Sequence, residues 1–167
     1  MTAHATDSAE FDVSLGRLQI LLGTACGVLI ANLYYAQPLT GLIGAALGIP
    51  NDLLGLLVTL PLAGYGAGLL LLVPLADLTE NRRLILGLVA LEAVSVGALG
   101  FLAHPVAFLG FAFAVGVFAA AVQILVPYVT YVTPEAMRGQ AVGKVVSGVM
   151  LGIMLARPAA SFSTAPA

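Results

Sequence analysis

Charged residues are scarce in this chain. Asp, Glu, Lys and Arg make up 8% of its 167 residues, whereas soluble domains carry roughly 25%. A water-facing surface needs a polar shell, and six basic with eight acidic residues cannot supply one. The scarcity argues against a water-soluble domain. It also argues against a nucleic-acid partner, because nucleic-acid binding requires clustered basic side chains.

Cysteine is nearly absent as well. The one cysteine, Cys26, cannot form an intrachain disulfide. No His, Cys and Asp cluster has the spacing of metal ligands, and no Ser or Cys has a base in an obvious partner position. We therefore expect no metal site, no cofactor and no enzymatic activity.

Apolar residues take the place of charge and make up 60% of the chain. A bilayer core about 30 Å thick needs roughly 20 apolar residues per helix. The runs between charges predict an all-α fold, a polytopic membrane helix bundle within about residues 17–162. The five predicted spans cover about residues 18–42, 53–76, 84–102, 106–132 and 141–162. We expect residues 1–16 to form a disordered cytoplasmic tail and residues 163–167 a short tail.

The basic residues fall on one side of these spans. Arg17 precedes the first, Arg82 and Arg83 lie between the second and third, and Arg138 and Lys144 adjoin the loop before the fifth. The loops on the other side have no Lys or Arg. Because cytoplasmic loops carry the excess of Lys and Arg, the N-terminus is predicted to be cytoplasmic. The acidic segment before the first run is unlike a signal peptide, so we expect that helix to be retained.

Glycines recur at four-residue spacing within the runs: Gly23 and Gly27, Gly64 and Gly68, Gly148 and Gly152. Small residues at this spacing let the backbones of membrane helices approach closely. We expect these glycines to lie at helix–helix contacts.

The loop at residues 74–83 has an acid, Asp77, where the second helix ends, and paired bases, Arg82 and Arg83, where the third begins. An acid there can pair with a base or with a helix N-terminus and hold one conformation against another. On a simpler interpretation, the two arginines only anchor the topology and Asp77 only ends a helix.

At this loop the chain resembles the major facilitator superfamily, specifically its drug-efflux-like bacterial branch. The family pattern is Gly-x-x-x-Asp-Arg-x-Gly-Arg-Arg, in which Asp77 matches the acid and Arg82 the last base. Four positions depart from the pattern: Val73, Leu78, Glu80 and Asn81.

Other segments share the resemblance. Residues 31–39 look like the end of the branch's first helix, and residues 123–127 and 138–143 are similar to its fourth helix and the following loop. The fifth run approximates the antiporter signature, with Ala156 in place of its last glycine. Its matching residues are Gly143, Gly148, Gly152, Arg157 and Pro158. The arginine that drug/proton antiporters often carry in helix 4 is absent, because Ala112 stands there.

Several polar residues fall within the predicted spans. Glu92 is an ionisable group in the third span, and such a group is a candidate functional residue by default. It is either protonated or hydrogen-bonded to a neighbour. Arg157 either snorkels outward, pairs with Glu92 or pairs with a helix that is missing from this chain. The resemblance suggests that four uncharged polar residues line the substrate cavity. Ordinary hydrogen bonds between helices would also explain why polar residues occur there. The four are Asn32, Tyr35, Gln37 and Gln123.

The resemblance implies a secondary transporter that exports small organic solutes by alternating access, in a bacterial inner membrane. Its partners would be the lipid bilayer, an unidentified solute and protons. The family has twelve helices in two halves, with the substrate between them near the midplane. Five helices predict an N-terminal part that lacks its C-terminal half. The alternative is a truncated, non-transporting fragment, or an accessory half that needs a partner.

Overall fold

The computed structural model describes the backbone of residues 3–162 and the side chains of residues 16–156 and Pro158. Every regular element in this part of the chain is helical. The α-helices are α1 (Ala3–Tyr35), α2 (Thr40–Leu47), α3 (Leu56–Leu78), α4 (Asn81–Leu99), α5 (Pro105–Ala119), α6 (Ala121–Val132) and α7 (Arg138–Phe162). Short 3-10 helices are η1 (Gln37–Leu39), η2 (Asn51–Leu53) and η3 (Glu135–Met137). The all-α prediction is confirmed.

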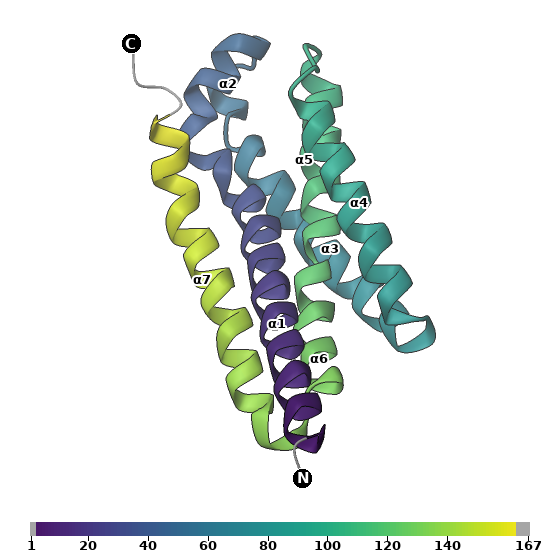
Figure 1. Cartoon of the computed structure of the whole chain (residues 1–167). Coiled ribbons are helices and arrows are strands. Elements are labelled where there is room, and N and C mark those ends of the chain that lie inside the picture. Colours follow the sequence, from purple (N-terminus) through teal and green to yellow (C-terminus); the bar gives the residue numbers. More distant parts are fainter. Residues whose placement is uncertain (1–2, 163–167) are drawn as a thin grey trace.

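The long helices run side by side as a bundle (Figure 1). Helix α1 packs chiefly against α7, and α5 packs against both α3 and α4. The α3–α4 and α6–α7 connections lie toward the end where the chain begins, and α2 and the α4–α5 connection lie at the other. Because Arg82, Arg83 and Arg138 begin α4 and α7, the basic residues gather toward one end of the bundle.

Four helical stretches are long and apolar enough to cross a membrane: Gly16–Leu47, Asn51–Leu78, Pro105–Val132 and Glu135–Ala156. They correspond to four of the five predicted spans. Helix α4 lies at the remaining predicted span, but its 19 residues include three charged side chains, those of Arg82, Arg83 and Glu92. The third predicted span, residues 84–102, therefore stays a prediction.

Two predicted spans are divided. The first is interrupted after Tyr35, where Pro38 lies in η1; proline lacks the amide hydrogen that a helix interior requires. Helix α2 then ends at Gly48, whose φ of 65° is the left-handed conformation that glycine adopts readily. The fourth is divided into α5 and α6 at Ala120.

Helix α1 begins at Ala3, within the segment that is predicted to be a cytoplasmic tail. Residues 3–15 contain neither glycine nor proline, the two residues least favourable in a helix. The division of the chain at residues 16 and 162 stays a prediction.

The core lies around α6, where α1, α4 and α7 pack against it. Its fully buried members include Cys26, Leu125, Val129, Ala141 and Val145. Many large apolar side chains are exposed instead, among them Leu70, Leu78, Phe101 and Met154. An exposed apolar surface of this extent suits a lipid environment.

Candidate transport site between α1 and α7

Glycine brings the backbones of α1 and α7 into contact. A Cβ added to Gly148 would collide with the backbone of Gly23, and one added to Gly152 would collide with that of Gly27. The close packing predicted for these four glycines is confirmed. Gly64 and Gly68 serve α3 in the same way, since a Cβ on either would strike the backbone of α5.

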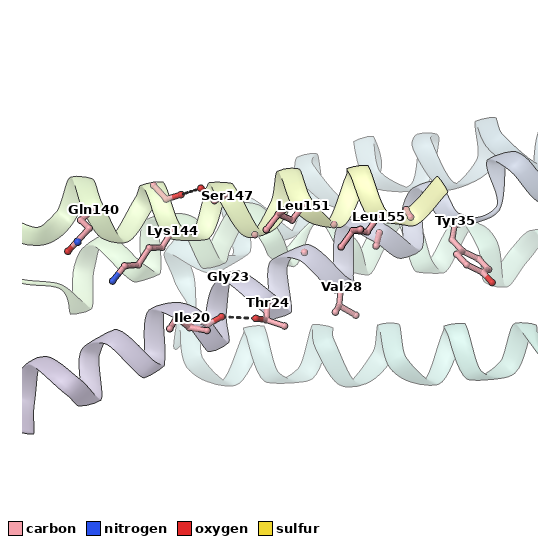
Figure 2. Close-up of a pocket in the computed structure, with 16 residues that line it drawn as sticks. Ile20, Gly23, Thr24, Val28, Tyr35, Gln140, Lys144, Ser147, Leu151 and Leu155 are labelled. Carbon is pink, nitrogen blue, oxygen red and sulfur yellow. Dashed lines mark hydrogen bonds between the residues drawn. The ribbon is translucent and has the colours of Figure 1, made fainter. Parts of the chain in front are cut away.

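A groove of about 880 Å³ runs along the α1–α7 contact (Figure 2). Its walls are mostly apolar. Helix α1 contributes Ile20, Gly23, Thr24, Gly27, Val28, Ala31 and Tyr35. Helix α7 contributes Gln140, Gly143, Lys144, Ser147, Gly148, Leu151, Gly152, Leu155 and Ala156. Lys144 is the charged residue among these lining side chains, and they include no Asp or Glu.

Lys144 is held by a buried partner on the opposite helix. Its ammonium donates a hydrogen bond of 2.9 Å to Oε1 of Gln19, whose side chain is only 2% exposed. The amide nitrogen of Gln19 is buried and finds no partner among the described residues. Of the five basic residues whose side chains are described, Lys144 is the one that is not exposed.

Two hydroxyl groups in the groove are hydrogen-bonded within their own helices. Thr24 donates to the carbonyl of Ile20 at 2.9 Å, and Ser147 donates to that of Gly143 at 2.8 Å. Both hydroxyl protons are thereby used by the backbone. Lys144 is left as a hydrogen-bond donor at this end of the groove.

On another face of α1, Asn32 reaches α4. Its side-chain amide donates to Oε1 of Glu92 at 3.2 Å. Glu92 is completely buried, and its Oε2 has no partner in the described part of the chain. The structure thus contains the neighbour hydrogen bond that is one of the alternatives for Glu92. The side chain of Arg157, the other proposed partner, lies outside the described residues.

The loop between α3 and α4 holds an ion pair that does not include Asp77. Arg83 pairs with Glu80 at 2.8 Å, both of them exposed, and no ion pair joins Asp77 to Arg82 among the described residues. Asp77 instead lines a smaller pocket of about 240 Å³, together with Asn81 at the start of α4 and residues of α3 and α6 that include Gln123. The side-chain amide of Gln123 donates to the Tyr65 hydroxyl at 2.9 Å.

Many of the predicted site residues fall into three places. Tyr35, Gly143, Gly148 and Gly152 line the α1–α7 groove. Asn32 pairs with Glu92, while Gln123 and Asp77 share the smaller pocket. Gln37 lies in η1, and Pro158 is exposed on α7.

Sequence reasoning missed Gln19 and assigned Lys144 only to topology. Their pairing joins positions 125 residues apart. The available indication was a polar residue, Gln19, directly inside an apolar run. Its partner depends on how α1 and α7 are rotated against each other, and spacing along the chain does not contain that information.

Comparison with known proteins assigns the sequence to a family. Residues 20–165 match the Major Facilitator Superfamily. The uncharacterized transporter YgaY of Escherichia coli O157:H7 is 40% identical over 146 residues, which are 86% of this chain and 36% of that protein. The "Probable transporter SCO4007" of Streptomyces coelicolor is 35% identical over 140 residues, 82% of this chain and 32% of that protein.

The chain thus spans about a third of the length of these curated relatives. No solved structure gives a significant match. The match covers all the elements that build the groove, and the apolar helices are those of an integral membrane protein. The chain belongs to the Major Facilitator Superfamily, a family of membrane transporters and not of enzymes.

Proposed function

We propose that this chain forms the N-terminal part of a secondary transporter that exports small organic solutes by alternating access. The observation that carries the proposal is a sequence identity of 40%, over 86% of this chain, to a protein named as a transporter. The chain spans 36% of that relative, so the complete transport cycle would involve helices beyond the five predicted here.

Export, as the direction of transport, is supported by the segments that resemble the drug-efflux-like branch. They are residues 31–39, residues 138–143 and the glycine series of α7. In this proposal the α1–α7 groove faces the solute path, because it is the larger of the two cavities described above and lies between helices in backbone contact. The loop from Asp77 to Arg83 lies at the predicted cytoplasmic end and acts as a conformational switch.

The proposed test joins residues 1–156 to the part of the Streptomyces relative that follows the aligned region. The chimera would be expressed in bacteria that lack their main efflux pumps. Accumulation of fluorescent anionic, cationic and neutral solutes is then measured, with the intact relative as positive control. We expect the chimera to lower accumulation of at least one class. An uncoupler of the proton gradient should abolish this effect if protons are the coupling ion.

A chimera that inserts into the membrane but exports none of the solutes exported by the intact relative would contradict the proposal. Insertion is checked by fractionation, so that a folding failure is separated from a transport failure. Flux through the unjoined chain in vesicles would contradict the need for further helices.

A further inference from the structure

The α1–α7 groove has an unusual distribution of charge. Among the residues whose side chains the structure describes, its lining comprises one ammonium, that of Lys144, and no carboxylate. In an apolar environment the attraction between opposite charges is several times stronger than in water. A cationic solute would meet an uncompensated positive charge there, whereas an anion would be attracted.

Lys144 is also oriented toward the protein. A lysine near the end of a membrane helix usually extends its ammonium toward water. Here the ammonium binds Oε1 of Gln19, and Figure 2 shows the Lys144 side chain extending from α7 toward α1. An ammonium has three donors, and Gln19 accepts one of them. The buried amide nitrogen of Gln19 is a further donor without a partner among the described residues.

Beyond Lys144 the groove becomes apolar. Leu151 and Leu155 line it along α7, and Val28 and Ala31 line it along α1. The distance along α7 from Lys144 to Leu155 is about 16 Å at the usual helical rise. The glycines at the contact keep side chains off the floor of the groove. An apolar body lying there would leave water at a gain of about 25 cal/mol per Å².

We propose that the groove binds an amphipathic organic anion, with its acidic group at Lys144 and its apolar body along Leu151 and Leu155. This inference rests on the proposed transport function, because it names the class of solute that the same site takes. Charge complementarity selects an anion over a cation. The length of the apolar wall selects an elongated apolar body over a small polar acid.

The test uses the full chain in nanodiscs of phosphatidylcholine. The probes are a dansyl-labelled undecanoic acid, its uncharged amide and the matching amine. The dansyl group is excited directly at a wavelength where tyrosine does not absorb, the chain has no tryptophan, and empty nanodiscs give the baseline. We expect the acid to bind about tenfold more tightly than the amide, and the amine to bind more weakly than either.

The variants assign that preference to one residue. Lys144→Gln should reduce acid binding to the level of the amide, while Lys144→Arg should retain most of it. Arg138→Gln is the matched control, since Arg138 is an exposed cation on the same helix outside the groove. Unchanged binding of the amide would show that each variant is folded.

Equal binding of the amine and the acid, or an unchanged acid affinity in Lys144→Gln, would overturn the inference. Adding phosphatidylglycerol to the nanodiscs should leave acid binding unchanged. Displacement by that lipid would identify the groove as a lipid site and refute the solute assignment. A chimera that exports only cations would refute this inference while supporting transport. Acid binding without export of any solute would retain the groove assignment and refute the transport function.

Discussion

At the scale of single residues, the Asn32–Glu92 contact is an unusual feature of the described chain. Glu92 is completely buried, and one of its two carboxyl oxygens has no partner among the described residues. An ionisable group inside a membrane helix costs a few kcal/mol unless it is neutral or paired. The contact therefore joins α1 to α4 through a single polar bond in apolar surroundings.

Replacing Glu92 by Gln should leave thermal stability nearly unchanged, because the amide oxygen still accepts from Asn32. Glu92→Ala should lower the free energy of unfolding by about 1–3 kcal/mol, since it leaves the Asn32 amide without an acceptor and opens a cavity. Thermal unfolding in detergent, followed by circular dichroism, measures both. Glu80→Ala is the control with an expected change near zero, because the exposed Glu80–Arg83 pair contributes little. A Gln variant as unstable as the Ala variant would show that the carboxyl group itself is required.

Asp77 allows a second prediction at this scale. It lines the small pocket and has no ion pair with Arg82 in the part of the chain that the structure describes, so its proposed switch role needs a partner in another conformation. Asp77→Asn should lower export by the chimera about tenfold without reducing membrane insertion. A change of this size corresponds to a typical coupling free energy between two conformations. The control is Asp52→Asn, an exposed acid in η2 away from the pocket. Equal export by Asp77→Asn and the parent chimera would refute the switch role.

At the scale of helices, packing depends on where glycine occurs. Gly148 and Gly152 meet the backbone of α1, but Gly143, five residues before Gly148 on the same helix, has no atom of another helix within 4 Å of the place of its missing Cβ. Three glycines of one apparent series therefore differ in role. Two maintain a helix contact, and the third leaves open space in the groove.

This difference predicts opposite effects of the same substitution. Gly148→Ala should lower the free energy of unfolding by about 1–3 kcal/mol through overpacking against Gly23. Gly143→Ala should leave it unchanged or raise it by up to about 1 kcal/mol, because alanine favours the helix. Thermal unfolding of the two variants in one detergent makes the comparison. Similar losses in both would show that α1 and α7 are not in the described contact.

The apolar runs predicted the helices, because run length alone reports whether a segment can cross a bilayer. The small-residue spacing likewise predicted close contacts. It did not predict which helix would be the partner, since Gly148 fits any backbone that can approach it. The pairs Gln19–Lys144 and Asn32–Glu92 depend on helix rotation. Helix α2 was missed because the predicted first span ends inside it, at residue 42, although Pro38 lies just before its start and Gly48 caps its end.

At the scale of the whole molecule, the number of membrane spans determines on which side of the membrane each loop lies. Four stretches qualify as spans by length and composition. Helix α4 packs within the bundle against α5 while carrying two arginines at its start. If α4 crosses the membrane, Thr79 and His104 at its two ends lie on opposite sides. If it does not, they lie on the same side.

Single cysteines distinguish these arrangements, because Cys26 is fully buried and should give little background. A membrane-impermeant maleimide applied to intact cells should label Asn51→Cys and His104→Cys, both outside by the charge rule. Thr79→Cys and Glu135→Cys should react only after the cells are permeabilised. The unsubstituted chain is the control. The same result at Thr79→Cys and His104→Cys in intact cells, both protected or both labelled, would remove the predicted span at residues 84–102, since α4 would then begin and end on one face. Labelling of Glu135→Cys but not of Asn51→Cys would invert the whole bundle and place Lys144 near the outer surface.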